Sequence, residues 1–205
     1  MQNKKYRIDY TQKIEEFGRT LYRIVALADF GIVTTGYQGG YIESEKNLSP
    51  YGNAWVYGNA KVYDNAIVSG NARVYDNARV YDYARVCGNA RVYGNARVHD
   101  NARVYDNAWV CDNAIVSGNA IVSGNARVSG NAEVAKLCIT VRTREYHCTI
   151  SDKHMAIGCK NYTFSEWENF TDEEIRKMDT NALEWWTQWK PILFEILKVE
   201  NKVKT

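Results

Sequence analysis

Five side chains in the C-terminal third of the chain are of types that bind zinc. They are three cysteines and two histidines: Cys138, His147, Cys148, His154 and Cys159. Their spacing matches no standard arrangement of zinc ligands. Adjacent residues of an extended strand also point to opposite sides, which separates His147 from Cys148. We therefore expect no metal site.

Other sequence signatures of catalysis are also missing. The sequence contains no GxSxG nucleophile turn, no P-loop and no dinucleotide-binding glycine motif. The stretch GYQGGY at residues 36–41 lacks the strand–helix setting that phosphate binding needs, and we interpret it as tight turns. We therefore expect no catalytic residue and no cofactor, and an enzyme is the less favoured interpretation.

A different chemistry recurs through the middle of the chain, where arginine and tyrosine share a six-residue repeat. Fourteen repeats of the type NARVYD run without insertion over residues 53–136. Ala and Val alternate with Arg and Tyr, as in a β-strand, and the Gly-Asn or Asp-Asn pair that follows tolerates turn and left-handed backbone angles. Three such sides close a triangle, so 18 residues make one coil, and stacked coils pair as parallel strands about 4.8 Å apart. The sequence predicts a mainly β protein built on a parallel β-helix.

The register of the repeat extends past its clear part. Stepping back by sixes from Ala54 reaches small or apolar residues in the alanine position: Leu48, Ile42, Gly36 and Phe30. Stepping forward reaches Cys138, and the pattern fades near residue 142. We expect about six coils and three parts: an N-terminal cap at 1–34, the β-helix at 35–142 and a C-terminal strand–helix cap at 143–205.

Stacking by 18 residues sorts the outward side chains into three faces, which begin at Trp55 (first face), Lys61 (second face) and Ile67 (third face). Arginine beside an aromatic ring can hold a partner by stacking and cation–π contact, and the first face is richest in such pairs. Its candidate partner-binding residues are Trp55, Tyr57, Arg73, Tyr75, Arg91, Tyr93 and Trp109. In the alternative interpretation the ladders only stabilise the stack, and corner aspartates neutralise the arginines. These aspartates are Asp64, Asp76, Asp82, Asp100, Asp106 and Asp112.

The last repeats replace Arg and Tyr by Ile and Ser. We expect an apolar patch there that contacts the C-terminal segment or a second subunit: Ile115, Ile121, Ile139 and Val141.

Beyond the repeats, Thr171–Glu174 and Asn181–Glu184 resemble capping boxes, each of which starts a helix. Pro191 should kink or interrupt the second of these helices. We interpret the tryptophans of this part as core residues, with a partner-binding surface as the alternative.

Composition narrows the classes of partner. The 26 basic and 24 acidic residues give a net charge of +2, which is too even for a general nucleic-acid-binding protein. No apolar run is long enough to cross a membrane, and the charged N-terminus lacks a signal core. Five cysteines without paired spacing suit reduced thiols. We expect a cytoplasmic protein without membrane contact.

The repeats and three flanking segments resemble phage- and prophage-encoded hexapeptide-repeat proteins of the left-handed β-helix superfamily, which are commonly filed as acyltransferases. The flanking segments are LYRIVALADFG at 21–31, GGYIESEKNLS at 39–49 and IGCKNYTFSEWEN at 157–169. The resemblance implies a left-handed coil and self-association as a trimer or dimer. Acyltransferases of the superfamily carry a catalytic histidine and a loop that breaks the repeats. Here the repeats are unbroken, and His99 is the one histidine in register.

The resemblance leads to a functional hypothesis. We expect a non-enzymatic phage or prophage accessory protein that binds a host protein in the host cytoplasm and inhibits host defence. One alternative is a degenerate hexapeptide acyltransferase. The other is nucleic-acid binding through the Arg/Tyr ladder, which the even charge disfavours.

Overall fold

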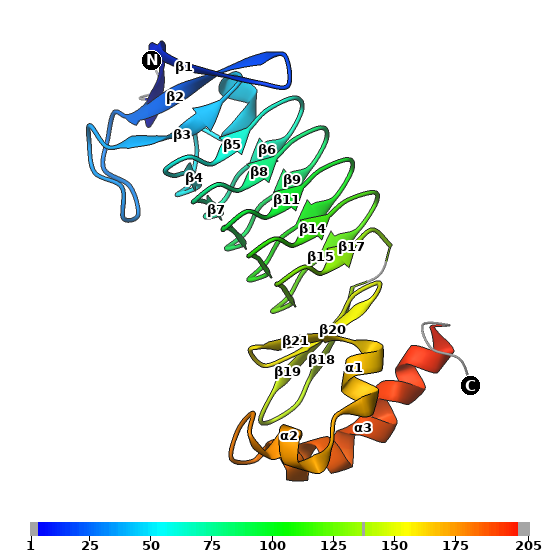
Figure 1. The fold of residues 1–205 in the computed structure, drawn as a ribbon. Coiled ribbons are helices and arrows are strands. Elements are labelled where there is room, and N and C mark those ends of the chain that lie inside the picture. Colours follow the sequence, from blue (N-terminus) through cyan, green and yellow to red (C-terminus); the bar gives the residue numbers. More distant parts are fainter. Residues whose placement is uncertain (1–3, 137, 201–205) are drawn as a thin grey trace.

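The computed structural model describes residues 4–136 and 138–200. It is an elongated molecule in which a β-solenoid lies between an N-terminal β-hairpin cap and a C-terminal α+β domain (Figure 1). None of the helices in these residues is long and apolar enough to span a bilayer.

The N-terminal cap joins the solenoid through one continuous sheet. Strands β1 (Tyr6–Glu16) and β2 (Arg19–Ala26) form an antiparallel hairpin, and β2 pairs with β3 (Gln38–Ile42). Strand β3 then pairs in parallel with the solenoid, and a short 3-10 helix, η1 (Glu45–Asn47), follows it. Lys5 and Asn47 are buried and donate hydrogen bonds to carbonyls of the first coil, among them those of Ala54 and Ala66. These bonds satisfy backbone groups that the end of a solenoid would otherwise leave unpaired.

The repeats form the predicted parallel solenoid. Fourteen two-residue strands, three to a coil, make about five turns, one fewer than the six coils expected. Their repeat alanines and valines are all buried and fill the interior. The strands of the first face are β4 (Trp55–Val56), β7 (Arg73–Val74), β10 (Arg91–Val92), β13 (Trp109–Val110) and β16 (Arg127–Val128). Those of the second face are β5 (Lys61–Val62), β8 (Arg79–Val80), β11 (Arg97–Val98), β14 (Ile115–Val116) and β17 (Glu133–Val134). Those of the third face are β6 (Ile67–Val68), β9 (Arg85–Val86), β12 (Arg103–Val104) and β15 (Ile121–Val122). The left-handed sense stays a prediction from the resemblance.

Upstream of the repeats the expected register is wrong by two residues. Ile42 pairs with Val62, and Leu48 bridges to Val68, so both occupy the valine position instead of the alanine position. Gly40 therefore lies beneath Ala60, where a Cβ atom would come within 2.6 Å of the Ala60 carbonyl oxygen. The side-chain-free glycine is what allows β3 to approach the first coil so closely.

The solenoid also ends earlier than the register predicted. Its last rung is Glu133–Val134, and Ile139–Arg142 (β18) belongs to a separate antiparallel sheet. Lys136 stands where earlier repeats place a corner Gly or Asp, so the chain lacks the residue type that turns the next corner. The backbone N–H groups of Ala135 and Lys136 instead donate to the Asp152 carboxylate of the next domain.

The C-terminal domain places helices against the sheet β18–β19–β20–β21 (Figure 1). Its other elements are β19 (His147–Ile150), β20 (His154–Ile157), β21 (Lys160–Thr163), α1 (Phe164–Asn169), α2 (Asp172–Arg176) and α3 (Ala182–Val199). The Thr171 capping box forms as predicted, whereas the Asn181 side chain makes no capping hydrogen bond. Helix α3 continues through Pro191 without interruption, contrary to one expectation. Trp167, Trp185 and Trp186 are buried in the core of this domain.

Candidate partner-binding face

The first face is the outward surface of the sheet β4–β7–β10–β13–β16, and its residues stack in the predicted register. Trp55 is the exception to the expected exposure. The N-terminal cap covers it completely, with the Tyr6 and Phe30 rings at 6.1 and 5.3 Å from its ring. Trp55 is therefore a core residue and cannot contact a partner on this surface. Sequence reasoning missed this because the covering residues lie outside the repeats.

The tyrosines of the first face contact one another. Tyr75 and Tyr93 stack with ring centroids 4.7 Å apart, and Tyr37 meets the edge of Tyr57 at 6.1 Å. Burial raises the pKa of the Tyr57, Tyr75 and Tyr93 hydroxyls. Their hydroxyl groups are therefore neutral at ordinary pH, and stacking covers the ring faces between Tyr75 and Tyr93.

The arginines of the first face are half-buried. Among the described residues, no ion pair includes Arg73, Arg91 or Arg127. The guanidinium carbons of Arg91 and Arg127 lie 5.0 and 5.7 Å from the Trp109 ring centroid, on which both pack. Cation–π contact of this kind holds an arginine in place without neutralising its charge.

The corner aspartates do not neutralise these arginines, which corrects the alternative interpretation. Each carboxylate accepts a hydrogen bond from the backbone N–H one coil further on, at 2.8–3.5 Å. The aspartates also adopt φ of 56° to 61°, the left-handed conformation that each corner requires. One of them, Asp64, pairs with an arginine, and that residue is Arg19 of the cap. The aspartates thus shape the corners and leave the first face cationic.

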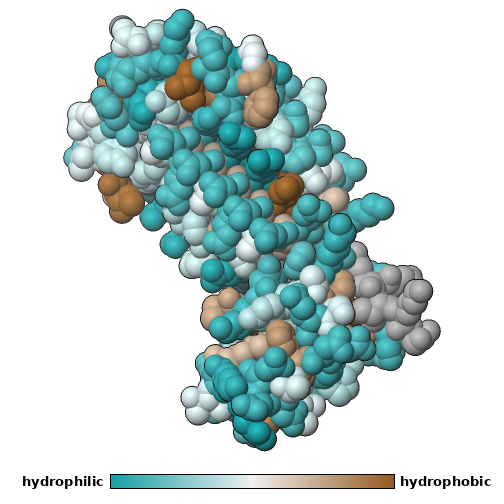
Figure 2. Space-filling model, viewed as in Figure 1, coloured by the Kyte–Doolittle hydropathy of each residue, from teal (hydrophilic) through white to brown (hydrophobic). Residues whose placement is uncertain are grey.

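Two hollows lie along the first face, and we call them together the binding groove. The N-terminal hollow is lined by Ile32, Tyr37, Tyr57, Arg73, Tyr75 and Arg91. The junction cleft lies where the solenoid meets the C-terminal domain, and the molecule narrows there (Figure 2). Its lining includes Arg91, Trp109, Arg127, Arg142, Tyr146 and His147. The N-terminal hollow reaches the corner that follows the first face, the junction cleft reaches the corner that precedes it, and Arg91 lines both.

The residues that the C-terminal domain adds to the groove had no signal in the sequence. Arg142 ends β18 and His147 begins β19, so the two residues lie on either side of the hairpin turn and pair with each other. Only the docking of this hairpin on the solenoid brings them beside Arg127. The backbone N–H of Arg127 donates to the Thr149 hydroxyl, which fixes that docking.

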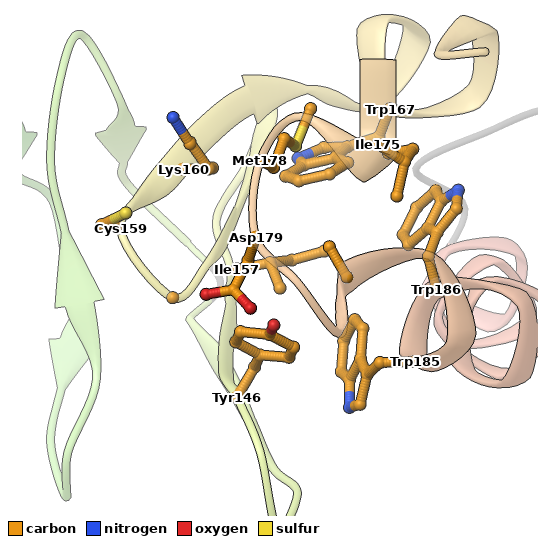
Figure 3. Close-up of a pocket in the computed structure, with 12 residues that line it drawn as sticks. Tyr146, Ile157, Cys159, Lys160, Trp167, Ile175, Met178, Asp179, Trp185 and Trp186 are labelled. Carbon is orange, nitrogen blue, oxygen red and sulfur yellow. The ribbon is translucent and has the colours of Figure 1, made fainter. Parts of the chain in front are cut away.

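A cavity in the C-terminal domain adjoins the groove (Figure 3). Its volume is about 60 Å³, and mostly apolar side chains line it: Ile157, Trp167, Ile175, Met178, Trp185 and Trp186. Tyr146 and Gly158 line both this cavity and the junction cleft. Burial and a hydrogen bond to Asp179 raise the pKa of Tyr146 to about 12.

The four residues expected to form one apolar patch are divided between three surfaces. Ile115 lies on the second face and Ile121, 47% exposed, on the third. Ile139 and Val141 belong to β18 and pack against the core of the C-terminal domain. The patch therefore does not form as a unit, because β18 leaves the solenoid register.

Side chains that could bind a metal or act as a base occur in the C-terminal domain and at the solenoid corner that contains His99. Cys148 is buried in the core while its neighbour His147 is exposed on the other side of β19. Among the described residues, Asp82, His99 and Asp100 can bring ligand atoms within 4.8 Å of one another. Both carboxylates already accept backbone N–H groups, and the His99 ring stacks on Tyr81 at 4.9 Å. This cluster is part of the corner structure.

Comparison with known families agrees with the repeat architecture. A family model described as YdcK beta solenoid repeat matches residues 60–74, 72–84, 84–100, 96–112 and 108–124. No curated protein matches the chain. The match lies wholly within the solenoid, and together with the fold it makes this chain a β-solenoid repeat protein.

Proposed function

We propose that this β-solenoid protein is a non-enzymatic binding protein that holds a host macromolecule in its binding groove. The observation that carries the proposal is the set of half-buried arginines, Arg73, Arg91 and Arg127, which have no ion pair among the described residues. Removing a charge partly from water has a free-energy cost, and a partner of opposite charge offsets it. Arg85, Arg97 and Arg103 on the other faces also form no ion pair within the described part of the chain, but they are exposed and water solvates them.

The rigidity of the groove also supports a binding role. The inner rungs β7, β10 and β13 are hydrogen-bonded to a rung on either side, and Arg91 and Arg127 pack on Trp109. Binding then costs little ordering of the protein, because the contact residues are already in position. A surface of this kind suits a protein whose task is to hold a partner.

The biological setting rests on the resemblance of the repeats and flanking segments to phage and prophage proteins. On that basis the partner is a host protein in the host cytoplasm, and the consequence of binding is inhibition of a host defence. Self-association as a trimer or dimer has the same basis.

The test is affinity capture from a bacterial host lysate, with and without nuclease, followed by mass spectrometry. We expect a stoichiometric host protein that survives nuclease and is lost with Arg73→Glu/Arg91→Glu. The matched control is Arg85→Glu/Arg103→Glu, which makes the same charge change on the third face and should retain the partner. Equal retention by both double variants would refute the groove as the binding site.

A degenerate acyltransferase is the second candidate, and one contact favours it. His99 Nδ1 lies 3.3 Å from the Asp100 carboxylate, an arrangement that can orient an imidazole as a base. Calorimetry with acetyl-CoA tests it. Heat of binding that disappears in His99→Ala would support this candidate, and absence of heat would dismiss it.

A further inference from the structure

We infer that the groove binds an extended acidic segment of a protein, and that one apolar side chain of this segment enters the tryptophan-lined cavity. The inference rests on the proposed function and specifies its partner. Four features carry it: the length of the groove, its charge, the packing of its rings and the position of the cavity.

The length of the groove indicates a polymer. From the rung of Tyr57 to the rung of Arg127 the first face spans four steps between paired strands. At about 4.8 Å for each step the distance is roughly 19 Å. An extended peptide covers it with about six residues at roughly 3.3 Å each. A single metabolite would fill only one of the two hollows.

The charge of the groove favours carboxylates. Its cations are Arg73, Arg91, Arg127 and Arg142. Two acids also line it: Asp76, which accepts the Gly94 N–H at 3.1 Å, and Glu145 in the junction cleft, so the four arginines outnumber the acids. Arginine binds a carboxylate through two parallel hydrogen bonds, and such pairs gain strength where water is partly excluded.

The packing of the rings disfavours single-stranded nucleic acid. Bases bind such proteins by stacking on open aromatic faces. Tyr75 and Tyr93 stack on each other, and the guanidinium groups of Arg91 and Arg127 both pack on Trp109. The tyrosine edges and hydroxyls that remain suit the backbone and side chains of a peptide.

The cavity supplies a site for an apolar anchor. A cavity of this size holds roughly four water molecules, which is about the space of one leucine side chain. Tyr146 and Gly158 line both cavity and cleft, so the cavity adjoins the cleft that contains Arg127 and Arg142, and we place the apolar side chain of the bound segment there. Figure 3 shows Tyr146, Asp179 and Trp185 directed toward one another at one side of this space.

The test uses fluorescein-labelled probes and polarisation. The first probe is an acidic peptide about eight residues long with one central leucine, the second replaces the leucine by serine, and the third is a thymidine oligonucleotide of similar length. We expect the leucine peptide to bind in a salt-dependent manner, and the serine peptide to bind about tenfold or more weakly because it lacks the buried side chain. Arg91→Gln should abolish binding of the peptide, whereas Arg103→Gln on the third face should leave it unchanged.

The outcomes separate this inference from the proposed function. Binding of the oligonucleotide in preference to both peptides would overturn the inference in favour of nucleic acid. Equal binding of the leucine and serine peptides would refute the inference that an apolar side chain enters the cavity. If no probe binds while the lysate still yields a partner that depends on Arg73 and Arg91, the acidic-segment inference fails and the proposed function stands. If neither probes nor lysate depend on these arginines, both fail.

Discussion

Replacement of Asp76 tests the observation on which the proposed function depends, namely that the first-face arginines are not neutralised by the corner aspartates. The Asp76 carboxylate accepts the Gly94 N–H, and its backbone has φ of 60°. Asp76→Ala loses the hydrogen bond, about 1 kcal/mol, and places alanine in a left-handed conformation that costs about 1–2 kcal/mol. The expected loss is about 2–3 kcal/mol, which should lower the urea midpoint by about 1 M. Asp76→Asn keeps both the acceptor and the tolerated backbone angle, so its loss should stay below about 0.5 kcal/mol.

The same pair of variants shows whether the arginines are free. If Asp76 does not neutralise Arg73 or Arg91, Asp76→Asn should strengthen binding of an acidic partner about twofold or more, because it removes a repulsive charge beside the groove. The measurements are urea unfolding followed by circular dichroism, and polarisation with the acidic peptide. The reasoning is refuted if Asp76→Asn destabilises the protein as much as Asp76→Ala and this loss disappears in an Arg73→Gln/Arg91→Gln background. That coupling would mean that the carboxylate is paired with the arginines.

Two further predictions concern the caps. Gly40→Ala should destabilise the protein by about 1–3 kcal/mol, because the added Cβ meets the Ala60 carbonyl oxygen at 2.6 Å; unfolding at the wild-type urea midpoint would contradict the two-residue shift of register. Hydrogen bonds from Thr171 lower the pKa of the Glu174 carboxyl group. The ionised Glu174 therefore stabilises α2 fully at pH values above the ordinary glutamate pKa of about 4.3. This stabilisation is lost as the pH falls through the lowered pKa. Acid titration by circular dichroism should show this loss in the wild type but not in Glu174→Gln, and identical curves would exclude the effect.

The interior of the solenoid could be predicted from the sequence because one repeat contains all of its determinants. Alternation places Ala and Val inside, and the corner residues permit the turn, so each repeat specifies the position of the next. The three faces follow from counting, and the pairings Arg73–Arg91 and Arg97–Ile115 confirm that count.

The ends of the solenoid could not be predicted by the same reasoning, because contacts outside the repeat decide them. Trp55 occupies an outward position, yet the cap folds over it and buries it. Ile42 has the right character for either inward position, and the small size of Gly40 selects the valine position. At the other end, Lys136 in place of a corner residue stops the coil although the alternation of side chains continues.

The binding groove depends on three-dimensional packing to a still greater degree. The sequence indicated Arg73, Arg91 and Trp109, since all three lie in register on the first face. The sequence did not predict that Arg142 and Tyr146 belong to the groove, because they reach it only through the docking of the β18–β19 hairpin. The role of the corner aspartates was also beyond sequence reasoning, because an aspartate beside an arginine is equally suited to an ion pair and to a backbone hydrogen bond.

The last repeats show that the solenoid does not need arginine and tyrosine to stack. Ile115 and Ile121 replace arginine, and serine follows in the tyrosine position, yet these rungs pair with their neighbours in the same way as the others. Stability alone therefore does not account for the arginines and tyrosines of the first face. Half-buried cations without counter-ions lower the stability of the free protein, and a partner that supplies the missing negative charge recovers it. Side chains that stacking does not require, with charges that no described residue compensates, are the reason why we propose a binding groove rather than a structural ladder.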